Sequence, residues 1–319
     1  MKILVVRFSS IGDIVLTTPV IRCLHQITGV EVHFLTKKSF SSLLEANPHL
    51  SKIYAIDKKV EEVLRRLKAE RYDCIIDLHR NIRTYKLTML LGVKSFRFNK
   101  LNLQKWLLTN LHIDRLPNVH IVDRYMETVR PLGVKNDGQG LDFFIPQKAV
   151  VPREELPTGD YIALVIGAAH ATKRLPDDQL IELCQKLNRP VVLIGGPGDK
   201  EAGSRIKTKA GRHITNTCGK YSILQSASII AQSGVVITHD TGMMHIAAAL
   251  QKRIISVWGN TVPEFGMYPY YGRQPDKNTS VEVKKLPCRP CSKIGYDSCP
   301  KGHFKCMREI VIDEIVALV

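Results

Sequence analysis

The residues best suited to chemistry lie at a turn between two apolar segments. Asp240, Thr241 and Gly242 separate the β-branched run 234–238 from the stretch 244–250, whose apolar residues suit a helix. Such a run is typical of a buried parallel strand, so the three residues fall at a strand-to-helix turn. N–H groups at a helix start carry partial positive charge and can hold a phosphate. Alternatively, Asp240 or Thr241 only caps the helix, because caps are commoner than ligand sites.

Two other predicted strands also end in polar residues. The run 2–8 leads into the small, polar turn 9–13, and the run 161–166 leads into the loop 167–176, which carries Lys173. The carboxyl ends of parallel strands are where open α/β sheets bind their ligands. The recurrence of such junctions favours ligand binding over simple capping.

Three motifs at these junctions resemble those of the ADP-heptose:lipopolysaccharide heptosyltransferases. They are SSIGD at 9–13, KRLP at 173–176 and DTGMMH at 240–245, and they occur in the family's order across nearly the whole chain. The resemblance implies an inverting glycosyltransferase of the two-domain GT-B type. It further implies that the enzyme moves L-glycero-D-manno-heptose from ADP-heptose to the lipopolysaccharide inner core, onto either Kdo or a first heptose.

The resemblance makes Asp13 the general base. Inverting transfer needs a carboxylate that takes the acceptor hydroxyl's proton while that oxygen attacks the anomeric carbon opposite the leaving diphosphate. Gly12 would let the backbone come close to the acceptor, and Ser10 could donate a hydrogen bond there. From the residues alone, Asp13 could instead cap the helix that follows.

The same resemblance places the nucleotide sugar at the other two motifs. Lys173 would stabilise the charge that grows on the departing diphosphate without a metal, although a lone lysine is usually a solvated surface residue. Asp240 would bond the heptose hydroxyls. His245 lies one helical turn after Thr241 and could face the same way, or it could be an ordinary helix histidine. The implied donor-binding residues are Thr172, Lys173, Asp240, Thr241, Gly242 and His245.

Two arginines three residues apart follow the predicted strand 74–78. Arginine forks bind carboxylates through paired hydrogen bonds, and the family's inner-core acceptor, of the lipid A–Kdo type, carries Kdo carboxylates. Arg80 and Arg83 are therefore candidate acceptor clamps, to which Arg7 or Arg124 could add. The alternative is a solvated basic helix start.

The elements that position these motifs follow an α/β pattern in each half of the chain. Its 319 residues suit two domains, and strands alternating with helical stretches such as 60–67 imply mostly parallel sheets. A polar break at 155–160 is the expected linker. We predict a Rossmann-like acceptor-binding domain over 1–157 and a Rossmann-like ADP-sugar-binding domain over 158–319, facing a central cleft. The predicted strands cover 2–8, 30–35, 52–56, 74–78, 161–166, 190–194, 235–238 and 254–257.

The composition favours an anionic partner. The formal net charge is +16 and the pI about 9.5, which suits a nucleic acid, an anionic membrane, or a phosphorylated or carboxylated substrate. We expect no nucleic-acid partner, because no motif of that kind is present. With no apolar run near ~18 residues and no signal peptide, a cytoplasmic protein is expected. Basic and apolar residues over 84–109 could rest on the inner membrane's anionic face, or form ordinary core with a solvated face.

Half of the eight cysteines form the pattern C-x2-C-x7-C-x6-C, at Cys288, Cys291, Cys299 and Cys306, with His303 among them. In a reducing cytosol this clustering favours a structural zinc site over disulfides, although the spacing is not that of a standard zinc finger. The family's chemistry needs no metal or other cofactor. Any zinc would therefore only hold a loop, and the alternative is ordinary loop cysteines.

Two other functions remain compatible with these features. The same fold could use another nucleotide sugar or another acceptor. Outside enzymes, the basic surface and a Cys-rich metal knuckle could form a nucleic-acid-binding module. That function leaves Asp13 and the turn at 240–242 without a role.

Overall fold

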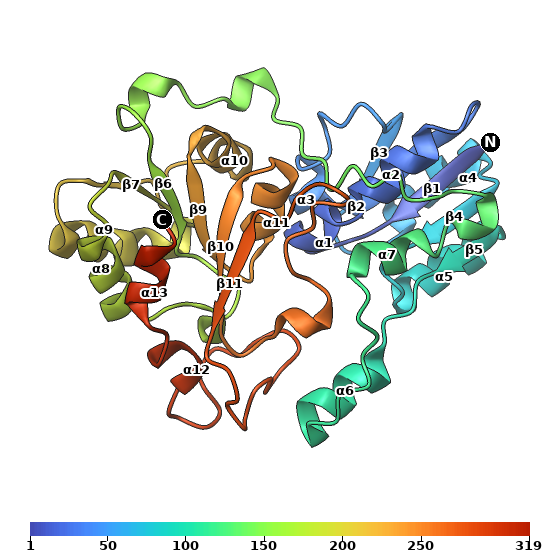
Figure 1. The fold of residues 1–319 in the computed structure, drawn as a ribbon. Coiled ribbons are helices and arrows are strands. Elements are labelled where there is room, and N and C mark those ends of the chain that lie inside the picture. Colours follow the sequence, from blue (N-terminus) through green and yellow to red (C-terminus); the bar gives the residue numbers. More distant parts are fainter. The chain divides into compact units, whose positions relative to one another are not determined.

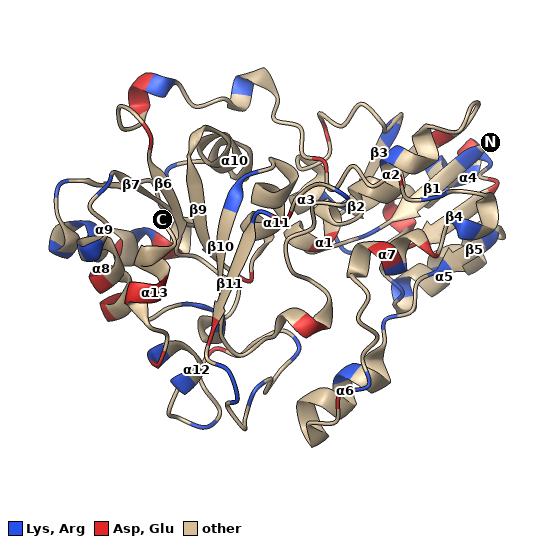
Figure 2. Cartoon of the chain, viewed as in Figure 1, with Lys and Arg blue, Asp and Glu red and all other residues tan.

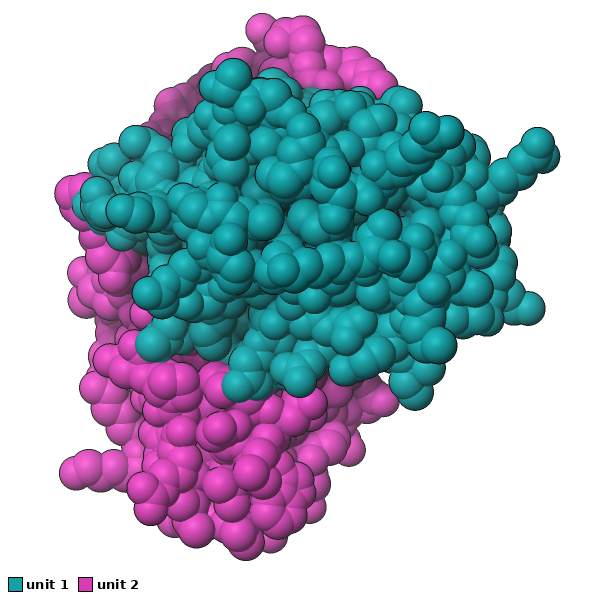
Figure 3. Space-filling model, turned by 90° about the vertical axis from the view of Figure 1, so that its right-hand side faces the viewer, with its two compact units in different colours: residues 1–100, 119–144, 270–274 teal, residues 101–118, 145–269, 275–319 magenta.

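The chain forms two compact units (Figure 1), and the computed structural model describes all residues from Met1 to Val319. Unit 1 comprises residues 1–100, 119–144 and 270–274, and unit 2 comprises residues 101–118, 145–269 and 275–319 (Figure 3). The chain therefore passes between the units more than once. In the sequence, the boundary predicted after residue 157 falls after the last strand of the first sheet and before the first strand of the second. The acceptor and donor roles predicted for the two halves stay predictions.

A five-stranded parallel sheet forms the centre of unit 1, in the order β3-β2-β1-β4-β5. Its strands are β1 (Lys2–Val6), β2 (Glu31–Lys37), β3 (Lys52–Ile56), β4 (Cys74–Asp77) and β5 (Lys94–Arg97). The central strands are apolar and buried, as expected for a parallel sheet covered on both faces. The helices of this unit are α1 (Ile11–Val15), α2 (Thr18–His25), α3 (Lys38–Ser41), α4 (Glu61–Glu70), α5 (Ile82–Leu91) and α7 (Ile121–Met126).

The strand order of unit 1 reverses at β1. From β1 the chain proceeds to β2 and β3 on one side, and it then returns to β4 and β5 on the other. Open α/β sheets bind ligands at such a switch point, outside the carboxyl ends of the strands. The turn 7–13 follows β1, and residues 78–83 follow β4, which pairs with β1 up to Val6 and Asp77. The fold therefore places two predicted site segments at neighbouring strand ends.

Helix α4 shows how the local sequence sets these elements. Its apolar residues recur with helical period, and Val63 and Leu67 are buried in the core beside Leu4 and Val6. The helix ends at Arg71, whose φ of 54° is left-handed. The helical stretch predicted over 60–67 is thus confirmed.

A six-stranded parallel sheet forms the centre of unit 2, in the order β11-β10-β9-β6-β7-β8. Its strands are β6 (Ile162–Val165), β7 (Val191–Ile194), β8 (Ile214–Asn216), β9 (Val235–His239), β10 (Arg253–Trp258) and β11 (Asn278–Glu282). The helices are α6 (Asn102–Leu111), α8 (Asp177–Lys186), α9 (Lys200–Ala210), α10 (Ile223–Gln232), α11 (Gly242–Ala249), α12 (Lys305–Arg308) and α13 (Ile312–Ala317). Short 3-10 turns occur in unit 1 at η1 (Arg130–Leu132), and in unit 2 at η2 (Gln147–Ala149), η3 (Arg153–Glu155), η4 (Ala171–Lys173), η5 (Pro197–Asp199) and η6 (Pro263–Phe265).

The neighbouring strands β6, β9 and β10 position the candidate residues of unit 2. Leu164, Ile237 and Val257 from these strands share one buried core. Because the strands are parallel and adjacent, the loops that follow them leave the sheet at the same edge. These loops are 166–175, 240–241 and 259–262.

The predicted strands are all present, with ends within two residues of the predicted ones. The α/β fold with two Rossmann-like units is therefore confirmed. Three strands were missed, namely β5, β8 and β11, and each lies at an edge of its sheet. No helix of the structure combines the length and the apolarity that crossing a membrane would require.

Candidate active site

Asp13 lies in the first turn of α1, just after β1, and both of its carboxylate oxygens are engaged. Oδ2 accepts hydrogen bonds from the Ser10 backbone N–H at 3.1 Å and from the Ser10 hydroxyl at 2.8 Å. Oδ1 lies 2.6 Å from Nη2 of Arg7. The bond to the Ser10 N–H is the capping contact that the sequence left open. Capping uses one lone pair only, so it does not prevent the carboxylate from taking a proton.

Arg7 is fixed in the wall of this turn. Its guanidinium donates to the backbone oxygens of Ser9 at 2.7 Å and Leu78 at 2.5 Å, and to the Tyr125 hydroxyl at 3.1 Å. Only 9% of the residue is exposed. A buried arginine with this many partners holds its charge in one place, and the carboxylate of Asp13 with it.

The ionisation state of Asp13 is set by opposing effects. Burial alone would raise the pKa of Asp13, but the Arg7 charge and the Ser10 hydrogen bonds outweigh it, so the pKa lies below its usual value. The carboxylate is therefore ionised at neutral pH, which is the state that a general base needs. Its side chain is 20% exposed, so the oxygens remain partly accessible.

His79 is a neighbour of Asp13 that sequence analysis missed. Burial, with the charges of Arg7 and Lys100, lowers its pKa to about 3, so the imidazole is neutral at physiological pH. The ring packs edge-on against Phe8, with ring centres 5.1 Å apart. The available signal was its position directly after the predicted strand 74–78.

Arg80 and Arg83 both lie near the carboxyl end of β4, but they are tied to different carbonyls. The Arg80 guanidinium donates to the Phe98 oxygen at 3.0 Å, and the Arg83 guanidinium donates to the Lys58 oxygen at 3.3 Å. Arg83 also lies over the Phe8 ring at 5.3 Å. Both arginines thus lie at the switch point, but their guanidinium groups do not form a paired fork. Their role as acceptor clamps stays a prediction.

Lys173 and Asp240 form an ion pair in unit 2. The ammonium Nζ lies 2.5 Å from Oδ2 of Asp240 and 3.4 Å from its backbone oxygen. The Thr261 hydroxyl donates to the same Oδ2 at 2.8 Å. The two charged side chains are only 15% and 14% exposed, so Lys173 is not the solvated surface lysine of the alternative interpretation.

The start of α11 follows Asp240 directly. Thr241 is the N-cap residue, but its side chain makes no capping hydrogen bond, and the Asp240 carboxylate bonds Lys173 and Thr261 instead. Thr241 therefore occupies the N-cap position considered for it, but without a side-chain cap, and Asp240 does not cap the helix. Gly242 begins the helix with its N–H outside the helical bonding pattern, as an anion site requires. His245 is buried within α11, with 2% of its surface exposed.

Thr172 is buried beside Lys173 and has both of its polar functions engaged. Its N–H donates to the Tyr296 oxygen at 3.1 Å, and its hydroxyl accepts from the Tyr296 N–H at 2.8 Å. These bonds fix the backbone next to Lys173. The predicted contact between Thr172 and the donor stays a prediction.

Asn260, after β10, is a second residue that sequence analysis missed. It is 1% exposed, and neither polar atom of its side-chain amide has a hydrogen-bond partner. Its backbone N–H donates to the Thr172 oxygen at 3.4 Å, so it lies beside the loop of Lys173. A buried amide without partners costs roughly 1–3 kcal/mol, which suggests that a ligand satisfies it. The available signal was a Gly-Asn-Thr turn after the predicted strand 254–257.

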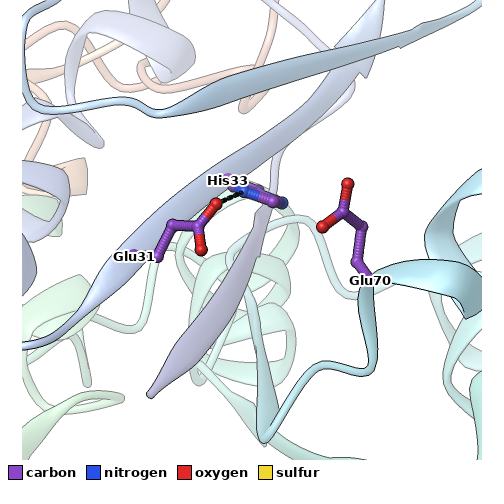
Figure 4. Close-up of side chains that lie close together, drawn as sticks. All are labelled: Glu31, His33 and Glu70. Carbon is purple, nitrogen blue, oxygen red and sulfur yellow. Dashed lines mark hydrogen bonds and ion pairs between the residues drawn. The ribbon is translucent and has the colours of Figure 1, made fainter.

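Glu31, His33 and Glu70 form a separate group whose potential metal-binding atoms lie within 4.8 Å of one another (Figure 4). His33 lies 2.7 Å from Oε1 of Glu31. Glu70 already accepts from the ammonium groups of Lys2 and Lys52, each at 2.7 Å. Two ammonium groups occupy oxygens that a cation would need, so a partly exposed polar network around buried His33 accounts for this group.

Comparison with known proteins then decides the family. Residues 60–296, more than half of the chain, match glycosyltransferase family 9 (heptosyltransferase). The chain belongs to this family. It is therefore a glycosyltransferase, as predicted. The matched segment contains Lys173 and Asp240 but begins after Asp13, so the general-base role of Asp13 stays a prediction.

Individual relatives agree with this assignment. The chain is 24% identical to lipopolysaccharide heptosyltransferase 1 of Campylobacter coli over 290 residues, which cover 82% of this chain and 84% of that protein. Its fold is similar to a glycosyl transferase family 9 structure from Veillonella parvula, with a TM-score of 0.79, 21% identity, and coverage of 99% and 95% of the two chains. It is also similar to the Escherichia coli heptosyltransferase WaaC with ADP, with a TM-score of 0.69, 20% identity, and coverage of 100% and 98%. These likenesses confirm the GT-B type of fold.

Proposed function

We propose that this heptosyltransferase moves L-glycero-D-manno-heptose from ADP-heptose to the lipopolysaccharide inner core, with inversion at the anomeric carbon. The fixed, ionised carboxylate of Asp13 carries this proposal. It combines a lowered pKa with a partly exposed position at the end of β1. The relatives named as lipopolysaccharide heptosyltransferases and the WaaC structure with ADP support this choice of donor and acceptor.

The proposed reaction has one proton transfer and one displacement. Asp13 accepts the proton of the acceptor hydroxyl while that oxygen forms its bond to the anomeric carbon. The bond from the anomeric carbon to the diphosphate oxygen breaks on the opposite face, and ADP leaves with the electron pair. Arg7 and Ser10 keep the carboxylate oriented between turnovers. No metal enters this scheme.

The Lys173–Asp240 pair suits an exchange of partners when the donor binds. The ammonium would turn from the Asp240 carboxylate to the diphosphate, where it stabilises the developing charge. Asp240 would then be free to accept hydrogen bonds from heptose hydroxyls. The N–H groups at the start of α11 and the buried amide of Asn260 would supply further contacts.

Because the proposed acceptor is anchored in the membrane by its lipid, we propose that the exposed face of α5 contacts the membrane. Ile82 and Met89 are 88% and 82% exposed, and Tyr85 lies between them on the same helix face. Lysines and arginines are distributed over both units, including Lys86 and Arg83 on this helix (Figure 2). Apolar anchors flanked by cationic side chains fit peripheral contact with the anionic face of the inner membrane.

Product analysis on defined acceptors tests this proposal. Purified protein is incubated with ADP-heptose and either a lipid A–Kdo acceptor or the same acceptor carrying one heptose. The proposal expects release of ADP, one added heptose by mass, and an inverted anomeric configuration by NMR. Transfer only from a different nucleotide sugar, or only to an acceptor without Kdo, would replace it with the wider glycosyltransferase alternative.

A further inference from the structure

The proposed function leaves the four cysteines of the C-terminal region without a role. They lie in residues 286–306, here named the cysteine segment, which runs between β11 and α12 with no helix or strand before residue 305. Phe304 packs against the core at the end of the segment, but Ile294 and Tyr296 in its middle are 59% and 43% exposed, so apolar burial does not hold that part. A segment of this kind needs another source of rigidity, and a bound metal ion is a common one. The cysteines are Cys288, Cys291, Cys299 and Cys306.

The fold gathers these thiols into one neighbourhood. Burial raises the pKa of Cys306, and the nearby Cys291, Cys299 and Cys288 raise it further, while Cys288 and Cys299 likewise add to the effect of burial on the pKa of Cys291. All four are free thiols, although they span 19 residues of chain from Cys288 to Cys306. The sulfurs are not yet within the 4.8 Å spacing of the Glu31 group, so ligation requires them to draw closer. Four thiolates about 2.3 Å from one ion form the usual tetrahedral structural zinc site.

His303 supports the cluster from outside. Its Nδ1 accepts the Lys305 backbone N–H at 3.0 Å, so the proton of the neutral ring lies on Nε2. That nitrogen lies 3.7 Å from Sγ of Cys288, where it can donate to a thiolate. The surrounding sequence 284–308 carries seven Lys or Arg residues and a single acid, Asp297. This charge would compensate the net negative charge of four thiolates around a divalent ion.

The cysteine segment also contacts the loop that carries Lys173 and the loop after β10, whose Thr261 donates to Asp240. The backbone N–H and oxygen of Tyr296 form hydrogen bonds with the backbone N–H and the hydroxyl of Thr172, the residue before Lys173. Arg289, which lies between the first two cysteines, donates to the oxygens of Gly259 at 2.5 Å and Thr261 at 2.9 Å. The segment therefore links the loops after β6 and β10.

We propose that Cys288, Cys291, Cys299 and Cys306 bind one structural zinc ion, and that this ion holds the cysteine segment against the Thr172 loop. The ion takes no part in bond making or breaking. By fixing Tyr296 and Arg289, it fixes the backbone from which Lys173 extends. The zinc would thereby support nucleotide binding, and this part of the proposal rests on the proposed function of Lys173.

Metal analysis of the full chain, purified under reducing conditions, tests the site itself. We expect about one zinc per chain, and tetrahedral thiolate–cobalt absorption after replacement of the ion by Co²⁺. Cys291→Ser and Cys299→Ser should each lose most of the zinc. The matched control is Cys218→Ala, at a buried cysteine of the same unit outside the segment, and it should keep the full content. Zinc-free wild-type protein whose four thiols react freely would overturn the proposal, whatever the variants do.

Measurements of ADP binding test the supporting role of the zinc separately from the existence of the zinc site. Removal of zinc by a chelator, with the circular dichroism spectrum retained, should weaken ADP binding by roughly tenfold or more, the scale of one lost charged hydrogen bond. Thr172→Val should weaken ADP binding while the zinc content stays full. Unchanged ADP affinity in the zinc-free protein would overturn the supporting role. Full zinc content in wild-type protein that never binds ADP would refute the proposed donor and leave the metal site standing.

Discussion

Lys173 and Asp240 show at the scale of single residues how a charge pair can be both stable and reactive. Each neutralises the other across 2.5 Å in a site where both are mostly buried. Under the proposed function, an incoming diphosphate would offer the ammonium a stronger partner, with two charged groups in place of one. The carboxylate released in this way would become an acceptor for sugar hydroxyls. In this proposal, one short contact connects donor binding to sugar recognition.

Lys173→Ala should weaken ADP binding roughly 10- to 100-fold, the scale of a charged hydrogen bond, and should also slow transfer. Calorimetric titration with ADP measures the first effect. Lys186→Ala is the matched control, because Lys186 also pairs with a carboxylate, that of Asp313, but lies on α8 away from the strand-end loops. An unchanged ADP affinity in Lys173→Ala would remove the lysine from the donor site.

Arg7→Gln should move the acid limb of the kcat/KM profile to higher pH. In the wild type, Arg7 holds the pKa of Asp13 below its usual value against the opposing effect of burial. Without the arginine, burial dominates, the pKa rises, and the base is protonated at a higher pH. Arg130→Gln, at an exposed arginine paired with Glu127, should leave the profile in place. A profile that does not shift in Arg7→Gln would show that the observed limb belongs to another group.

The same ion pair affects stability. Because the folded-state pKa of Asp13 is lowered, the pair stabilises the fold at neutral pH, and this contribution is lost as the pH falls through that pKa. Arg7→Gln should therefore lower the melting temperature more at pH 7 than in acid. An equal loss at both values would mean that Arg7 stabilises the fold by packing alone.

Sequence motifs indicated the charged candidates and several neutral ones, but they did not indicate His79 or Asn260. Asp13, Lys173 and Asp240 lie in short motifs at strand ends, where the chemistry of the residue type is informative. His79 and Asn260 matter because of burial, which lowers the pKa of one and leaves the amide of the other without partners. Burial depends on packing between distant segments, so a single sequence does not disclose it.

At the scale of elements, the position of a strand in its sheet decided whether it could be predicted. Central strands are buried on both faces and show continuous apolar runs, as in β1 and β7. The missed strands β5 and β11 lie at edges, with sequences KSFR and NTSVE and mostly part-exposed side chains. Pairing with a neighbouring strand defines such strands more than their own residues do.

The exposed face of α5 carries a prediction at this scale. The double variant Ile82→Glu and Met89→Glu should bind vesicles containing phosphatidylglycerol at least roughly tenfold less tightly, since two apolar anchors become anionic. Its stability should change little, because both side chains are more than 80% exposed. Sedimentation with vesicles measures the binding, and Val150→Glu, at another exposed apolar residue, serves as control. Equal binding of the variant and the wild type would exclude α5 as the contact.

At the scale of the whole molecule, contacts between distant segments organise the chain in a way that local pattern does not reveal. Residues 101–118 belong to unit 2, where Leu108 packs with Val262 and Phe265. Residues 270–274 belong to unit 1, where the Tyr270 hydroxyl donates to Asp123. Alternating strands and helices predicted two sheets correctly, but these exchanged segments have no periodic signature.

Transfer by Asp13→Asn is the most direct test of the whole account. Asparagine keeps the size of the side chain and can still accept from Ser10, but it cannot take the acceptor's proton. Heptose transfer from ADP-heptose is measured by ADP release under single-turnover conditions, and donor affinity by titration. Asp57→Asn, at an exposed ion-paired acid, is the control. The account predicts near-normal donor affinity with transfer reduced by ~10²-fold or more. Transfer at the wild-type rate in Asp13→Asn would contradict it.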